Sequence, residues 1–136
     1  MIEEFKVITK NRYQLIDITN QIEQVIKQRK IKGGLAVVFV PHSTAGIILT
    51  ENESGLRQDW LKVLERLVSG INFSHNRIDN NADSHILSGL VNQERVLIIE
   101  DNRLVRGTWQ QIFLAEFDGP RTRRVVVKVS PEVGNS

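Results

Sequence analysis

Hydrophobic and polar residues alternate along much of the chain, and a period of two predicts β-strands. Residues 4–10 and 13–18 alternate in part around a polar stretch, which predicts two short strands joined as a hairpin. The continuous apolar run 34–40 ends at Pro41, as expected for a central strand, and 45–51 predicts another strand. A strand, turn and strand are expected over 95–105, and two more strands over 108–120 and 123–129.

Helical spacing occurs in two longer segments. Thr19 is placed to cap a helix over residues 20–30, which the glycines at 33–34 then stop. Ser54 is placed to cap a second helix whose apolar face carries Leu56, Trp60, Val63, Leu64 and Leu67. A polar loop over 69–83 leads into one or two helical turns at 82–90, and loops of this length are often functional.

These elements predict one α+β domain over residues 1–136. Strands outnumber helices, so a largely antiparallel β-sandwich or barrel-like core with two main helices is expected. Several strands are apolar on both faces. Both faces must then be covered by helices, by a second sheet or by a neighbouring subunit.

Composition narrows the classes of partner. The chain has 136 residues, 40% hydrophobic and 25% charged, which is ordinary for a folded domain. A formal net charge of +2 does not indicate a nucleic-acid partner, and the basic run 121–124 is interpreted as a solvated turn beside a strand. The absence of cysteine excludes disulfides and a cysteine nucleophile and fits a cytoplasmic location. No apolar run approaches the roughly 18 residues of a membrane span, so no membrane partner is expected.

All three histidines, at positions 42, 75 and 85, fall in loops or at the ends of elements. With a nearby carboxylate, three imidazoles could hold zinc or another divalent ion. No compact ligand pair such as H-x-H occurs, so the residues alone favour a surface or hydrogen-bonded histidine over a metal ligand at each position. Asn81 and His85 are four residues apart and would share one helix face.

Glu116 is expected to be a partly buried acid. Alternation places Ile112, Leu114 and Glu116 on one face of a strand and Phe113, Ala115 and Phe117 on the other. A buried carboxylate needs a partner, for which Arg121, a histidine or a metal ion is available. An internal salt bridge and a catalytic acid both remain open.

The segment "HSTAG", residues 42–46, offers two hydroxyls and small residues between two strands. Its backbone N–H groups could form a concavity for an anion. The same residues could equally make a tight turn in which Ser43 and Thr44 form only local hydrogen bonds.

Four blocks together carry a family resemblance: "HSTAGIILTENE", "NNADSHILSGL", "NRLVRGTWQQIFLAEFDGPR" and "RRVVVKV". The chain resembles the YjbQ-like family, also called the secondary thiamine-phosphate synthase family, over nearly its whole length. The resemblance implies a homotrimer whose pockets lie near subunit boundaries. It also implies a weak ability to join a pyrimidine diphosphate to a thiazole phosphate, with zinc or magnesium as helper. The alternative is a non-catalytic binder of a metal ion or of a small phosphorylated metabolite.

Site residues follow from the family's pattern, carried over position by position. The expected catalytic residues are His42, Glu51, His85 and Glu116. The expected substrate-binding residues are Ser43, Thr44, Asn81, Asp83, Thr108, Trp109, Gln110 and Arg121. The expected metal ligands are His42, His75 and His85. Ser43 and Thr50 depart from the residues that the family commonly has there, and the longer loop before Asn81 leaves the equivalence of His75 open.

Overall fold

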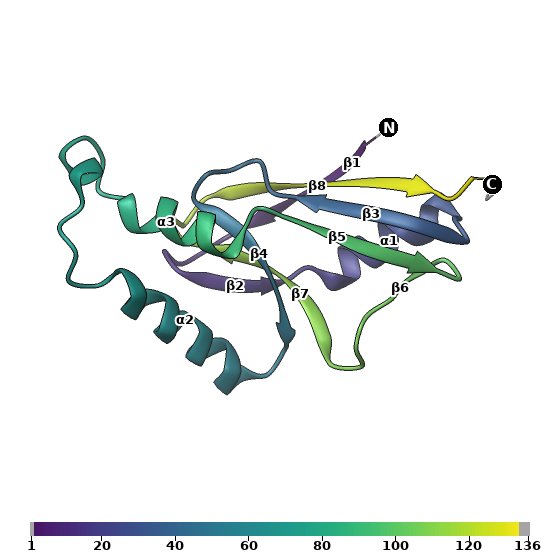
Figure 1. The fold of residues 1–136 in the computed structure, drawn as a ribbon, viewed down its shortest axis with the longest axis horizontal. Helices are drawn as coiled ribbons and strands as arrows, with labels where there is room; N and C mark the ends of the chain where they lie inside the picture. The colour runs from purple at the N-terminus through teal and green to yellow at the C-terminus, as the bar shows by residue number, and fades with distance from the viewer. Residues whose placement is uncertain (1, 134–136) are drawn as a thin grey trace.

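A computed structural model describes residues 2–133 and confirms an α+β fold with antiparallel sheets (Figure 1). The five-stranded sheet has the order β1 (Ile2–Ile8), β8 (Thr122–Pro131), β3 (Gly33–Phe39), β5 (Glu94–Glu100) and β6 (Arg103–Leu104). The three-stranded sheet has the order β2 (Gln14–Asp17), β7 (Gln110–Glu116) and β4 (Ala45–Glu51). The helices are α1 (Thr19–Arg29), α2 (Ser54–Val68) and α3 (Ala82–Val91), with a 3-10 turn η1 (Ser74–Arg77).

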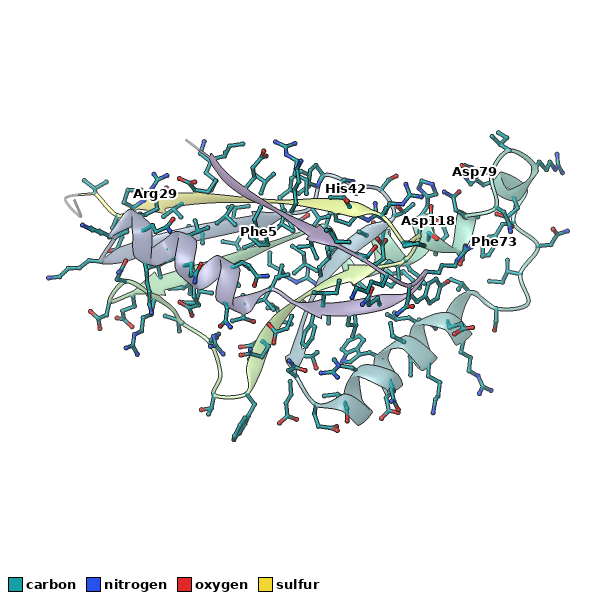
Figure 2. All side chains as sticks on the ribbon, turned by 180° about the vertical axis from the view of Figure 1, so that it is seen from behind. Phe5, Arg29, His42, Phe73, Asp79 and Asp118 are labelled. Carbon is teal, nitrogen blue, oxygen red and sulfur yellow. The ribbon has the colours of Figure 1, made fainter. Side chains whose placement is uncertain are left out.

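Two hydrophobic clusters hold these layers together. The larger cluster joins α1 to the inner faces of both sheets, through residues such as Ile22, Val38 and Leu114. The second cluster joins the other face of the three-stranded sheet to α2 and α3, through Leu64 and Leu87. Figure 2 views the molecule from behind, where α1 lies in front of the sheets and Arg29 is labelled near its C-terminal end.

Strand β7 is buried on both faces, and the expected alternation is confirmed. Ile112 and Leu114 belong to the larger cluster, whereas Ala115 and Phe117 belong to the second. Glu116 lies on the same face of β7 as Ile112 and Leu114 and is 0% exposed. Its carboxylate is therefore buried between the two sheets.

The N-terminal hairpin prediction is wrong. β1 pairs with β8, and β2 pairs with β7, so the two segments belong to different sheets. The turn between them carries the chain from one sheet to the other. Alternation indicated both strands correctly, but it contains no information about which distant strand each one pairs with.

Both predicted helix caps differ from the observed ones. Thr19 is the first helical residue, and its hydroxyl donates to Asp17 Oδ1 at 2.6 Å and accepts the Ile112 N–H at 2.8 Å. The cap of α2 is Glu53, whose carboxylate accepts the N–H groups of Gly55 and Leu56 at 2.7 and 2.9 Å.

Two further expectations about helices need correction. The predicted apolar face of α2 is only partly buried, because Val63 and Leu67 are each 57% exposed. The helical turns expected at 82–90 are present but form a longer helix, since α3 extends over ten residues. In the described part of the chain, no helix is long and apolar enough to cross a bilayer.

The outer face of the five-stranded sheet carries an apolar patch. Cross-strand pairs Leu35 with Ile98 and Val37 with Val96 lie side by side on β3 and β5. These four side chains and Phe39 are between 36% and 60% exposed. We call these five residues the outer-sheet patch.

Candidate functional site

A polar cavity of about 580 Å³ opens where three loops meet. The loops are the β3–β4 turn, the segment before α3 and the β7–β8 turn. Polar side chains predominate in its lining: Arg12, Pro41, His42, Ser43, Thr44, Asp79, Asn80, Asn81, His85, Asp118, Arg121 and Arg123. Six of the predicted site residues therefore lie around one cavity.

A buried ion pair forms one wall. The Arg123 side chain is 2% exposed and pairs with Glu116, donating from Nε to Oε1 at 2.9 Å and from Nη2 to Oε2. Nη2 also donates to Thr44 Oγ1 at 2.8 Å and to the Thr44 carbonyl at 3.1 Å. Thr9 Oγ1 donates to Glu116 Oε1 at 2.7 Å. The internal salt bridge is thus the observed state of Glu116, with Arg123 in place of the expected Arg121.

The position of Arg123 also corrects the interpretation of residues 121–124 as a wholly solvated turn. Arg121 and Arg124 are exposed, but Arg123 faces inward with Val125 and Val127. The alternation along β8 could have revealed this, because Arg123 shares the parity of the buried valines.

His42 is held in a neutral form. Its Nε2 accepts the backbone N–H of Arg124 at 2.9 Å, which leaves the ring proton on Nδ1. Burial lowers the pKa of His42, and the nearby charge of Arg123 lowers it further, while Glu116 opposes that shift. A neutral imidazole with a donating Nδ1–H therefore lies at the cavity wall.

A chain of hydrogen bonds holds the opposite wall. His75 Nε2 and Asn81 Oδ1 are 3.0 Å apart, and Asn81 Nδ2 donates to Asp118 Oδ2 at 3.0 Å. Arg121 Nη2 donates to the same carboxylate oxygen at 3.1 Å. The rings of His75 and His85 meet edge to face, with centroids 5.0 Å apart.

Arg12 and Asp83 form the boundary with a second pocket. Arg12 Nη2 donates to both Asp83 oxygens at 2.8 and 3.0 Å and to the Asn80 carbonyl at 3.3 Å. Tyr13 Oη donates to Asp83 as well. Burial opposes ionisation of Asp83, but the bonds from Tyr13 and Arg12 outweigh it and lower the pKa of Asp83. Asp83 thus positions Arg12 and does not line the polar cavity.

The remaining predicted residues lie elsewhere. Along the β4–β7 ladder Ala45 is opposite Glu116, whereas Glu51 is opposite Gln110. Seven residues of strand span about 20 Å, so Glu51, Trp109 and Gln110 are at the far end from the histidines. Trp109 is 71% exposed. Thr108 lines a separate hollow of about 430 Å³ with Lys27 and Arg106. One copy of the chain does not bring the two groups together.

The expected metal centre has no ligand set within one described chain. Among residues 2–133, no group of three or more His, Cys, Asp or Glu side chains is placed to hold an ion. Glu116, an expected cation ligand, already accepts bonds from Thr9, Arg123 and the Asp118 N–H. These residues do not fit the divalent ion that the resemblance implied.

Comparison with known proteins agrees with the sequence blocks. The family model "UPF0047 protein YjbQ-like" matches residues 3–132. The chain belongs to this family. A UPF0047 protein of Archaeoglobus fulgidus is 43% identical, with 92% of this chain and 98% of that protein covered. The UPF0047 protein YugU of Bacillus subtilis is 33% identical over 95% and 98% of the two chains.

A solved structure extends the match to three dimensions. The crystal structure of a YbjQ-like protein of unknown function from Sulfolobus solfataricus superposes with a TM-score of 0.94 at 40% identity. It covers 97% of each chain. The YjbQ-like fold is therefore established for this chain, and the chemistry has to be argued from the cavity.

Six lining residues were missed from the sequence: Arg12, Pro41, Asp79, Asn80, Asp118 and Arg123. Parity along β8 could have identified Arg123. Arg12 lies in a turn whose sequence carries no such signal, and it reaches the cavity only because the turn crosses between the sheets.

Proposed function

We propose that the polar cavity binds the phosphate group of a small phosphorylated metabolite. The observation that carries this proposal is the convergence of Arg12, Arg121 and Arg123 on one cavity. Guanidinium groups suit phosphate because they are planar, always charged and rich in donors.

Arg12 and Arg121 are each fixed by a carboxylate and can still donate to a ligand. The bonds from Arg12 to Asp83 and Asn80 all use Nη2, and Arg121 contacts Asp118 through Nε and Nη2. The other nitrogens can bind a ligand. Preorganised donors of this kind lower the entropic cost of holding a ligand. The Nδ1–H of His42 and the Ser43 hydroxyl add uncharged donors.

Calorimetric titration with inorganic phosphate and pyrophosphate tests this proposal. We expect saturable binding that weakens about tenfold or more in Arg121→Gln, because a hydrogen bond to a charged group contributes about 1.5–3 kcal/mol. Arg106→Gln is the matched control, since Arg106 lines the separate hollow. Absence of binding, or equal weakening in both variants, would reject the proposal.

The catalytic form of this proposal is a thiamine-phosphate synthase-like transfer. A thiazole phosphate would displace pyrophosphate from a pyrimidine diphosphate, and the arginines would stabilise the departing diphosphate. The neutral His42 and the nearby His85 support this version, because both line the cavity where the diphosphate would lie. Product formation from the two precursors, with magnesium or zinc added, is the assay. No product, or an unchanged rate in His85→Ala, would reject the catalytic form and leave only the proposal that the cavity binds a phosphorylated ligand.

We also propose that the chain acts as a homotrimer. The outer-sheet patch supports association, because monomers rarely expose contiguous apolar surface of this kind. The exposed Trp109 is a second large side chain that a neighbouring copy could cover. Sedimentation of the wild-type protein should give three times the mass of one chain. In Val37→Lys the measured mass should fall toward that of a single chain.

A further inference from the structure

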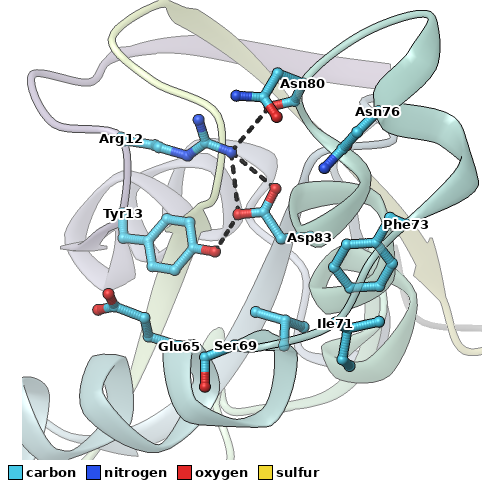
Figure 3. Close-up of a pocket in the computed structure, with 10 residues that line it drawn as sticks. Arg12, Tyr13, Glu65, Ser69, Ile71, Phe73, Asn76, Asn80 and Asp83 are labelled. Atoms are coloured by element: carbon cyan, nitrogen blue, oxygen red, sulfur yellow. Dashed lines mark hydrogen bonds and ion pairs between the residues drawn. The ribbon is translucent and has the colours of Figure 1, made fainter.

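A second pocket of about 560 Å³ shares Arg12 and Asn80 with the lining of the polar cavity. Figure 3 shows Arg12, Tyr13 and Asp83 joined by hydrogen bonds in its wall. Its walls come from Tyr13 at the start of β2, the C-terminal end of α2, the loop 69–80 and Asp83 on α3. Asp83 is the one residue of this lining that the family resemblance named, and the proposed phosphate site uses only Arg12 of it.

One side of the pocket is apolar. Val68, Ile71, Phe73 and the ring of Tyr13 line it. Val68 is 7% exposed and Phe73 packs against the second hydrophobic cluster, so this side is continuous with the core. Ile71 is 53% exposed, and it keeps an apolar surface open to the solvent. A wall of this kind favours a ring or another apolar group.

The polar side of this pocket does not favour a second anion. Its charged groups are Glu65, Asp83 and Arg12, and Arg12 is paired with Asp83. One arginine and two carboxylates line this pocket, whereas three arginines and two aspartates line the polar cavity. A negatively charged group would therefore bind in the neighbouring polar cavity, and an uncharged group would bind here.

Arg12 and Asn80 line both hollows. The guanidinium is held at their boundary by Asp83, which in turn accepts the Tyr13 hydroxyl. A ligand whose phosphate contacts Arg12 from the polar cavity would carry its ester substituent toward Val68, Ile71 and Phe73.

We propose that this second pocket binds the apolar, ring-bearing part of a phosphate monoester whose phosphate lies in the polar cavity. The inference rests on the proposed phosphate site and specifies its ligand further. It assigns Ile71 and Phe73 to ligand binding and Arg12 to the junction between the two parts.

Calorimetry with a homologous series tests this assignment. Methyl phosphate measures the contribution of the phosphate alone, and phenylalkyl phosphates with one to three methylenes add a ring at increasing distances. We expect at least one member to bind about tenfold tighter than methyl phosphate, because burying part of a ring is worth about that factor. Ile71→Ser should weaken the binding of that phenylalkyl phosphate about threefold to tenfold and leave the affinity for methyl phosphate unchanged.

Ile78→Ser is the matched control, because Ile78 lies in the same loop, is 87% exposed and lines neither hollow. Should methyl phosphate bind while no phenylalkyl phosphate binds tighter, the ring assignment is wrong and the phosphate site stands. Equal behaviour of Ile71→Ser and Ile78→Ser leads to the same conclusion. If no compound of the series binds, the phosphate site fails and this inference fails with it.

Discussion

The two ends of the β4–β7 ladder carry acids in opposite environments. At one end Glu116 is 0% exposed, and Arg123 and Thr9 satisfy its oxygens. At the other end Glu51 is exposed beside Gln110 and Trp109. The family resemblance places Glu116, Glu51, Gln110 and Trp109 among the expected site residues, but not Thr9 or Arg123. The fold separates them into a charged, tightly held wall and an open edge, so only the first group can act together within one copy.

The largest expected difference between the two ends is in stability. Glu116→Gln leaves Arg123 buried without its counter-charge, so we expect the free energy of unfolding to fall by about 3–5 kcal/mol. Glu51→Gln at the exposed end should change it by less than about 0.5 kcal/mol. Chemical denaturation of the two variants measures both values.

A double variant separates the lost charge pair from general disruption. Glu116→Gln combined with Arg123→Gln removes both charges, and it should recover part of the stability that Glu116→Gln loses. Equal losses in Glu116→Gln and Glu51→Gln would contradict the contrast between the ends.

Trp109→Ala examines what the open end does. The ring is 71% exposed in one copy, so the change should hardly affect the unfolding of an isolated chain. If a neighbouring copy covers it, association should weaken about tenfold or more, as for an aromatic residue at an interface. Sedimentation over a range of concentrations measures the assembly. An unchanged assembly would show that the proposed homotrimer does not use this end.

A smaller effect on stability depends on pH and is expected only at the end of the ladder near His42. The pKa of His42 is lowered on folding, so the unfolded chain binds more protons between the folded and unfolded pKa values. The contribution of neutral His42 to the free energy of unfolding is fully present above the unfolded pKa of about 6.5. It is lost as the pH falls from there through the lower pKa of the folded state. We expect denaturation midpoints to decrease between about pH 7.5 and about pH 5.5, and His42→Gln to flatten that decrease. An identical pH profile in His42→Gln would exclude this residue as the source.

The smallest effect is expected one residue from the buried pair. Arg124 pairs with Glu4 on the surface, and both side chains are about half exposed. Arg124→Gln should cost about 0–1 kcal/mol, since exposed ion pairs contribute little. A loss as large as that of Glu116→Gln would mean that burial does not decide the strength of these pairs.

Much of the fold could be predicted because local periodicity reports which side of a strand is buried. The strands at 45–51 and 95–105 and the two-faced burial of β7 follow directly from that pattern. The pairing of β1 with β8 could not be predicted in this way, because the partners are more than a hundred residues apart. Pairing over that distance depends on the packing of the whole core.

The candidate site was predicted in part for the same reason. His42, Ser43, Thr44, Asn81, His85 and Arg121 do line one cavity. Arg12 and Asp118 were missed, because turns bring them there without a periodic signal. Glu51 and Trp109 were grouped with the histidines by resemblance, but they lie at the far end of the β4–β7 ladder, which is about 20 Å long.

The position of β8 bears on how the nascent protein can fold. This strand is the last of the described elements, yet it lies between β1 and β3 and carries Arg123 into contact with Glu116. While the ribosome still holds it, β1 has no partner strand and the acid of β7 has no counter-charge. Folding of the larger sheet therefore waits until β8 has left the ribosome, and until then the edges of β1 and β3 are open to chaperones or to aggregation.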